Sequence, residues 1–191
     1  MHLDPTGWLS TNSTTSSIHH APSPNYNARP EQCDPYLLVV HSISLPPYRF
    51  SGPAVVQFFQ NTLDFDTHPW FTHIRDVRVS AHFFIRRSGH IVQFVSTWDR
   101  AWHAGISSFD GREQCNDFSI GIELEGADAV PYTPIQYQRL AALSRCLAHF
   151  HPIRAIRGHE HIAPGRKSDP GPAFNWHAYR LHSQLPTTFF P

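Results

Sequence analysis

The feature that most constrains the fold is a short run, residues 37–41, with the sequence Leu-Leu-Val-Val-His. Successive side chains of an extended chain point to opposite faces, so four consecutive large apolar residues require burial on both faces. Such a strand is typical of the middle of a sheet that is covered on both sides. The run therefore predicts a central buried strand with His41 at its end.

A second strand-like segment, residues 119–125, alternates between two kinds of side chain. Its isoleucine and leucine residues share one face, whereas Gly121, Glu123 and Glu125 share the other. The apolar residues indicate a central strand, so a carboxylate on its other face is well placed to act as a general base. The periodicity alone does not choose between Glu123 and Glu125.

The remaining pattern mixes strands and helices. Residues 83–95 have a hairpin pattern with a Ser-Gly turn, and residues 133–136 (Thr-Pro-Ile-Gln) form a capping box before a helix that runs to about Phe150. Short helices are expected at 54–63 and after Asn175, a short strand is expected at 153–157, and loops are expected at 42–53 and 98–111. The fold class that this order predicts is mixed α/β (α+β), with a central mixed sheet flanked by helices.

The chain of 191 residues has the length of one domain. Residues 10–35 are rich in Ser, Thr, Asn and Pro, and we expect residues 1–35 to form a largely irregular N-terminal arm that packs on the domain. We expect residues 36–191 to form the catalytic domain. His19 and His20 lie in the arm, where flexible neighbours would give a metal no fixed geometry.

Charge and cysteine content exclude several classes of partner. Lys plus Arg and Asp plus Glu balance at 15 each, so no basic excess points to nucleic acid or a membrane surface. No stretch approaches 18 apolar residues, and the three cysteines form no C-x-x-C pair. The N-terminus has no signal-peptide pattern. We therefore expect a cytoplasmic, monomeric protein that acts on a small molecule.

Residues 158–171 gather imidazoles, carboxylates and a lysine in a loop rich in Pro and Gly. His159 follows a predicted strand, and Asp169 lies in a part of the loop that prolines stiffen. Together with His41 they offer two imidazoles and one carboxylate, the donor set of a catalytic zinc with one open position. His161, His103 and His82 are alternative ligands. Lys167 is suited to stabilising an oxyanion.

Three separate motifs in this chain resemble those of the zinc N-acetylmuramoyl-L-alanine amidases. They are residues 38–41 (Leu-Val-Val-His), residues 116–126 (Asn-Asp-Phe-Ser-Ile-Gly-Ile-Glu-Leu-Glu-Gly), and residues 158–172 with their Gly-His and Asp-Pro-Gly-Pro ends. The resemblance extends from residue 7 to about residue 180. It is closest to the cytoplasmic members that act on 1,6-anhydro-muropeptides, and it implies a fold related to phage amidases and animal peptidoglycan recognition proteins.

The resemblance implies roles for particular residues. It assigns His41, His159 and Asp169 as ligands of one Zn²⁺ per chain, Glu123 rather than Glu125 as the catalytic carboxylate, and Lys167 as its electrostatic partner. The implied reaction is hydrolysis of the amide between N-acetylmuramic acid and the L-alanine of the stem peptide, in peptidoglycan recycling.

Contacts to the substrate are a separate expectation. Trp102 is placed to stack on a sugar ring, and Arg78 and Arg166 are suited to pairing with stem-peptide carboxylates. Ser42 is a further expected substrate contact. The chain departs from close relatives at Ser42, where asparagine is common, and at Gln114, where many have arginine, so stem-peptide affinity or preference is expected to differ.

The sequence leaves three alternative functions open. They are a non-catalytic module that binds peptidoglycan fragments, a zinc peptidase, and a broad-range amidase that acts on the intact cell wall.

Overall fold

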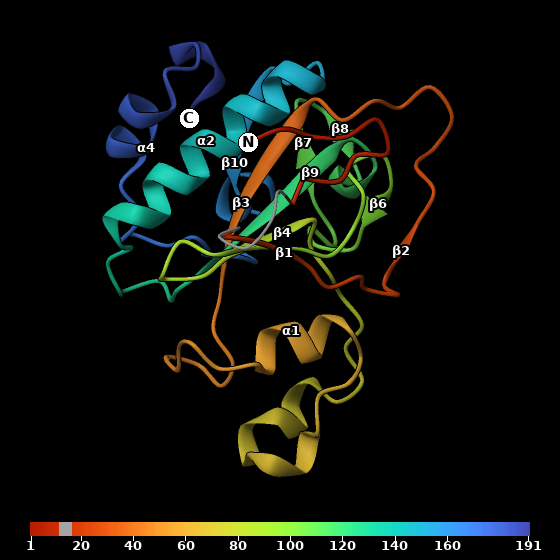
Figure 1. The fold of residues 1–191 in the computed structure, drawn as a ribbon, viewed down its shortest axis with the longest axis vertical. Helices are drawn as coiled ribbons and strands as arrows, with labels where there is room; N and C mark the ends of the chain where they lie inside the picture. The colour runs from red at the N-terminus through yellow and green to blue at the C-terminus, as the bar shows by residue number, and fades with distance from the viewer. Residues whose placement is uncertain (12–16) are drawn as a thin grey trace.

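A six-stranded mixed sheet forms the central layer of the computed structural model, which describes residues 1–11 and 17–191 (Figure 1). The strand order is β1-β5-β4-β9-β3-β10, and every neighbouring pair is parallel except the β4–β5 hairpin. The strands are β1 (Ile18–His20), β3 (Leu37–Ile43), β4 (Phe83–Ile85), β5 (Ile91–Gln93), β9 (Ser119–Glu125) and β10 (Ala155–Gly158). The predicted fold class, a mixed sheet flanked by helices, is confirmed.

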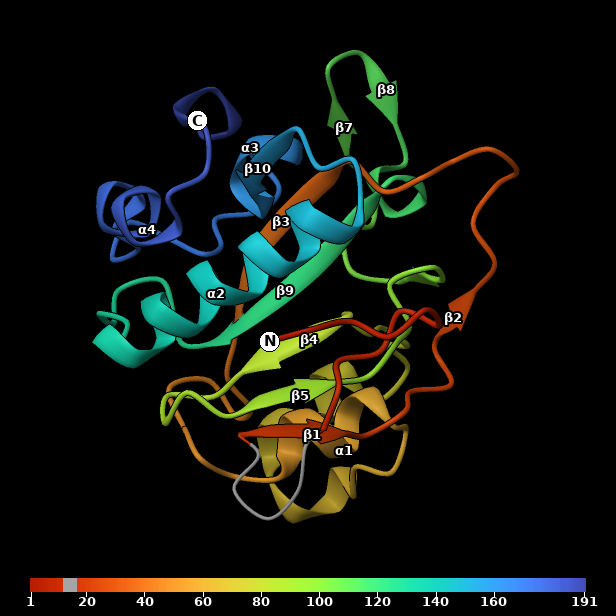
Figure 2. The same cartoon turned by 45° about the horizontal axis from the view of Figure 1, so that its top comes forward.

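Helices cover the two faces of this sheet unequally. The long α2 (Pro134–Phe150) crosses one face with α4 (Trp176–Ser183) packed beside it, whereas α1 (Ala54–Phe59) lies on the other side with two short 3-10 helices, Phe65–Thr67 and Pro69–Ile74 (Figures 1 and 2). The remaining elements are small: β2 (Tyr26–Asn27), β6 (Arg100–Ala101), β7 (Ser108–Phe109), β8 (Arg112–Glu113), α3 (His159–Ile162), and the 3-10 helices Cys115–Asp117 and Thr187–Phe189. In the described part of the chain, no helix is both long and apolar enough to cross a membrane.

Side-chain alternation in β3 decides on which face the site lies. Leu38 and Val40 point into the large core beneath α2, whereas Leu37 and Val39 pack in a separate cluster on the opposite face. His41 follows the odd-numbered residues, so it projects away from α2. The same alternation in β9 sends its isoleucines into the α2 core and places Glu123 on the face of His41.

Local sequence signals account for the helix boundaries. Thr133 and Gln136 form the predicted capping box at the start of α2, and the Asn175 side chain accepts from the backbone N–H of Ala178 at the start of α4. Several predicted boundaries were wrong. The strand expected to end at His41 continues to Ile43 because residues 42–43 pair with β9, and the strand expected from residue 153 begins at Ala155. The helix expected over 54–63 ends at Phe59, and the loop expected over 98–111 contains the two-residue strands β6 and β7.

The N-terminal arm contributes more to the sheet than its composition predicts. Its residues 18–20 form β1, which pairs in parallel with β5 at the edge of the sheet. Gln93 also fixes the start of the chain, since its side chain bonds to the backbone of Leu9 and of Gly7. The polar run 10–17 that marked the arm lies mostly outside the described residues.

Candidate active site

Two adjacent parallel strands bring the three predicted metal ligands together. Val40 and Gly158 are register partners of β3 and β10, so His41 and His159, each the next residue, lie side by side where β10 ends. The loop after α3 then returns Asp169. His41 Nδ1 lies 3.0 Å from His159 Nδ1 and 3.0 Å from Asp169 Oδ2, and His159 Nδ1 lies 3.1 Å from the same oxygen.

This donor set fits a zinc ion. Tetrahedral bonds of about 2.0–2.1 Å place ligand atoms about 3.3 Å apart, close to the observed triangle. His159 Nε2 lies 3.0 Å from the carbonyl oxygen of Ala104, which can only accept, so Nε2 carries the ring proton. The Nδ1 lone pair of His159 therefore faces Asp169. His159 Nδ1 and Asp169 Oδ2 are both electron-rich, and no proton of His159 lies between them.

The protonation states of the other two residues also suit metal binding. Burial lowers the pKa of His41 from 6.5 to about 4, so its imidazole is neutral at pH 7. Burial raises the pKa of Asp169, but the contacts of its carboxylate with the imidazoles of His159 and His41 outweigh it, and the net pKa is below the usual range. A neutral imidazole and an ionised carboxylate are the forms that bind a metal.

Glu123 lies beside the triangle of His41, His159 and Asp169, and its carboxyl group is buried. It is the register partner of His41 across β3 and β9, it is 8% exposed, and its Oε2 has no hydrogen-bond partner. Burial, together with the charge of Asp169, raises its pKa well above 4.5, while the charge of Lys167 opposes this. A carboxylate with a raised pKa takes up a proton readily, as a general base must.

Glu125 has a different environment although it lies on the same face of β9. Its two carboxylate oxygens accept backbone N–H groups, one from Ser51 and one from Arg87. These bonds hold two loops at the end of the strand and satisfy the buried charge. Glu123 is therefore the glutamate of β9 that is free to act in chemistry.

A cavity of about 340 Å³ is lined in part by Glu123 and the three residues of the metal triangle. Its polar side includes Lys167 and Ser42, and its other side is an apolar wall from the end of β3, the loop after it, α1 and the segment that follows α1. The wall residues are Ile43, Leu45, Pro47, Phe58, Phe59, Trp70, Ile74, Val77 and Val79. The cavity therefore places an apolar surface opposite an acid–base group, a lysine and a metal-binding triangle.

A second groove, of about 680 Å³, runs past the other side of the loop that carries Arg166. Gln114 lines this groove, as do Arg100 and Glu113. The Arg166 guanidinium donates to the carbonyl oxygens of Ala104 (2.7 Å) and Ile106 (2.5 Å), so it ties two loops together. Arg166 thus shapes the groove while using one of its amino groups on the backbone.

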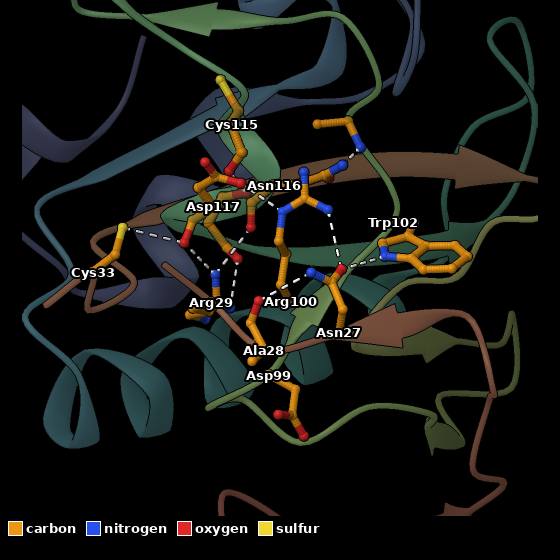
Figure 3. A network of polar contacts seen from close by, with 12 residues as sticks. Asn27, Ala28, Arg29, Cys33, Asp99, Arg100, Trp102, Cys115, Asn116 and Asp117 are labelled. Atoms are coloured by element: carbon orange, nitrogen blue, oxygen red, sulfur yellow. Dashed lines mark hydrogen bonds and ion pairs between the residues drawn. The ribbon is translucent and has the colours of Figure 1, made fainter. Parts of the chain in front are cut away.

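The other predicted substrate contacts lie outside the cavity lining. The Trp102 indole N–H donates to Asn27 Oδ1 at 2.7 Å (Figure 3). Arg78 is exposed and donates to the carbonyl oxygens of Arg75 and Val77 in its own loop. The arm therefore holds the nitrogen-bearing edge of the Trp102 ring. Arg78 lies between Val77 and Val79, which both line the cavity.

The alternative histidine ligands have other partners. His161 Nδ1 accepts the backbone N–H of Gly158 at 2.9 Å and so stabilises the turn before the metal triangle. His82 Nδ1 accepts the N–H of Gly121 at 3.0 Å. His103 does not reach the triangle, but its Nδ1 lies 2.9 Å from His41 Nε2. In the arm, His20 Nε2 lies 2.8 Å from the carbonyl oxygen of Leu9.

One supporting residue gave no signal in the sequence. Arg29, in the Pro-rich arm, places its guanidinium under the start of β9 and donates to the carbonyl oxygens of Asn116, Asp117 and Ser119 (Figure 3). Burial lowers its pKa to about 10, so it remains charged at neutral pH. The arm therefore stabilises the segment that carries Glu123, a role that composition could not indicate.

The metal-binding triangle, Glu123 and Lys167 in one cavity are the groups of a hydrolase with a candidate site for one metal ion. The sequence matches the N-acetylmuramoyl-L-alanine amidase family over residues 14–172. It is 53% identical, over 91% of each chain, to 1,6-anhydro-N-acetylmuramyl-L-alanine amidase AmpD of Salmonella typhimurium. The chain belongs to the N-acetylmuramoyl-L-alanine amidase family.

Solved structures agree with this assignment. The chain superimposes on a crystal structure of an AmpD selenomethionine derivative with a TM-score of 0.90 and 52% identity, covering 95% of this chain and 99% of that one. It also resembles the amidase AmiD of E. coli in complex with anhydro-N-acetylmuramic acid-L-Ala-D-gamma-Glu-L-Lys, with a TM-score of 0.56 and 30% identity over 81% of this chain and 60% of that one.

Proposed function

We propose that this protein hydrolyses the amide between 1,6-anhydro-N-acetylmuramic acid and the L-alanine of the stem peptide, with one Zn²⁺ held by His41, His159 and Asp169. The observation that carries the proposal is the triangle of three ligand atoms, 3.0–3.1 Å apart, next to a buried and unpartnered Glu123. When bound, zinc supplies a Lewis acid and lowers the pKa of a water molecule.

The protein's own groups then account for the proton transfers. Glu123 takes a proton from the attacking water as its oxygen bonds to the lactyl carbonyl carbon. The same carboxyl returns that proton to the amide nitrogen as the C–N bond breaks, which leaves a carboxylate on the sugar and a free amine on L-alanine. The Lys167 ammonium, in the lining of the same cavity, stabilises the negative charge that develops on the carbonyl oxygen.

The two cavities suggest how the substrate divides between them. The apolar wall opposite the triangle would contact the sugar and its lactyl group, whereas the groove lined by Arg100, Glu113 and Gln114 would take a charged peptide. Gln114 lines the groove and Ser42 lines the cavity, so their departures from the family pattern would alter substrate affinity or peptide preference rather than the acid–base chemistry.

The natural substrate is proposed to be a soluble muropeptide in the cytoplasm, acted on by a monomer. The name of the Salmonella relative, an anhydro-muramyl amidase, supports this substrate, and three free cysteines suit a reducing compartment.

The substrate is tested by comparing initial rates on anhydro-muramyl tripeptide and on intact sacculi at equal concentrations of stem peptide. Rapid release from the soluble substrate and little from sacculi is expected. Equal rates would instead assign a broad-range cell-wall amidase, and tight binding of both without cleavage would assign a binding module.

Lys167→Ala is expected to lower kcat by about 10²–10³-fold, the usual cost of removing one oxyanion-stabilising donor. Zinc content should be unchanged, because Lys167 is not a ligand. Lys167→Arg keeps the charge and should recover part of the rate. An alanine variant with parental kcat would show that Lys167 is a surface charge only.

A further inference from the structure

A buried histidine lies directly behind His41, on the side away from Asp169. His41 Nε2 is 2.9 Å from His103 Nδ1, and the two rings meet edge to face at 84°. His41 is 1% exposed and His103 is 9% exposed. Both side chains are buried and the two nitrogens face each other at hydrogen-bond distance, so the pair shares one proton between them.

The direction of that hydrogen bond follows from the groups beyond His103. The Ser119 hydroxyl donates its proton to the Cys115 carbonyl oxygen at 2.5 Å, because a carbonyl can only accept. His103 Nε2 lies 3.2 Å from the same hydroxyl oxygen, which has no further proton to give, so Nε2 is the donor. His103 Nδ1 is then the unprotonated nitrogen of its ring.

The consequence reaches the metal triangle. Because His103 Nδ1 accepts, the proton that it shares belongs to His41 Nε2. A neutral imidazole carries one ring proton, so His41 Nδ1 has its lone pair free, 3.0 Å from both His159 Nδ1 and Asp169 Oδ2. A chain of three hydrogen bonds, from a backbone carbonyl through a serine and a histidine, thus selects the tautomer of His41 that can bind a metal.

The position of the His103 ring is also fixed by contacts that do not involve His41. A β-carbon on Gly121 would lie 2.5 Å from His103 Cγ, so only glycine at this point of β9 leaves room for the ring. The backbone N–H of His103 donates to Asn116 Oδ1 at 3.1 Å. The ring is thereby held between β9 and His41 without depending on a bound metal.

We infer that His103 is a positioning residue of the zinc site, which acts by accepting the Nε2–H of His41 and so orients the ligand nitrogen Nδ1. The inference rests on the proposed function, since it requires zinc at the triangle. Metal-binding histidines commonly donate their second N–H to a fixed acceptor, and loss of that acceptor lowers metal affinity. In this chain the acceptor is itself an imidazole whose tautomer Ser119 determines.

Two substitutions separate the hydrogen bond from packing. Asparagine can place its amide oxygen near the position of the imidazole Nδ1, whereas leucine fills the space without an acceptor. His103→Leu should weaken zinc binding by about 10–100-fold in a chelator competition, and His103→Asn should stay within a few-fold of the parent. His151→Leu is the matched control: His151 is buried, it contacts Thr97 Oγ1 at 2.8 Å, and its replacement should leave zinc affinity unchanged.

A second readout does not depend on affinity. In the zinc-loaded parent, the proton on His41 Nε2 should give a slowly exchanging NMR signal, which His103→Leu should lose and His103→Asn should keep. Should His103→Leu fail to fold, Ser119→Ala serves in its place, since it removes the group that orients the His103 proton and should also weaken zinc binding.

Three results would overturn the inference. The first is a His103→Leu protein that binds zinc as tightly as the parent. The second, where Ser119→Ala replaces a His103→Leu protein that fails to fold, is parental zinc affinity in Ser119→Ala. The third is an equal loss of zinc affinity in His103→Leu and His103→Asn. A parent protein that binds no zinc would overturn the proposed function itself, which distinguishes the two failures.

Discussion

Asp169→Ala should abolish stoichiometric zinc binding and reduce amide hydrolysis to the background rate. Asp169 provides the only carboxylate of the metal triangle, and its Oδ2 contacts both imidazoles. Without it, two neutral imidazoles would remain, and the dipositive ion would lose its one anionic ligand. The check is metal content by mass spectrometry after dialysis against a weak chelator, together with the rate of peptide release from anhydro-muramyl tripeptide.

Asp99→Ala serves as the matched control for this change. Asp99 is partly buried, like Asp169, and its backbone carbonyl, rather than its carboxylate, contacts His82. The control should keep both zinc and activity. An Asp169→Ala protein that retained one zinc per chain would place the metal elsewhere and contradict the assigned ligands.

Glu123→Gln should lower kcat by about 10²–10⁴-fold, the usual contribution of a general acid–base group, while zinc stays bound. Glutamine preserves the shape of the side chain but cannot take up a proton. Activity and metal content, measured on the same preparation, separate this outcome from loss of the metal. A variant with parental kcat would exclude Glu123 as the base.

The same substitution should stabilise the metal-free protein at pH 8. Burial raises the folded-state pKa of Glu123 well above its usual 4.5, so this group favours the folded state at low pH. That stability is lost as the pH rises from the unfolded-state pKa through the folded-state pKa, since a buried charge must then form. The difference in Tm between variant and parent should therefore be positive at pH 8 and shrink toward pH 4.

Glu125→Gln is the control with the opposite expected sign. Both oxygens of Glu125 accept backbone N–H groups, and glutamine offers only one acceptor oxygen, so this variant should be less stable at pH 8. Its kcat should remain close to that of the parent. A Glu123→Gln variant that is destabilised like Glu125→Gln would show that the Glu123 carboxylate is stabilised in the fold.

Much of the fold was predictable because its signals are local. The apolar run that ends at His41, the alternation along β9 and the capping box at Thr133 each depend on neighbouring residues only, and each predicted element is present. The boundaries differed where pairing extended a strand, as at Ile43, because that depends on a partner more than seventy residues away.

The site was predictable only in part, for a related physical reason. His41 and His159 meet because β3 and β10 pair with Val40 opposite Gly158, a register that no local pattern specifies. Family resemblance selected Glu123, and the structure supplies the physical distinction from Glu125. The roles of Arg29 and Arg166 could not be predicted, since each depends on backbone carbonyl oxygens far along the chain.

The most direct test of the account is the reaction itself, carried out by the zinc-loaded protein on anhydro-muramyl tripeptide in ¹⁸O-labelled water, with the products identified by mass. The account predicts free tripeptide with an unlabelled L-alanine amine end, and an anhydro-muramic acid that carries one ¹⁸O in its lactyl carboxylate. Cleavage within the peptide, or an intact substrate in the presence of a fully occupied zinc site, would contradict it.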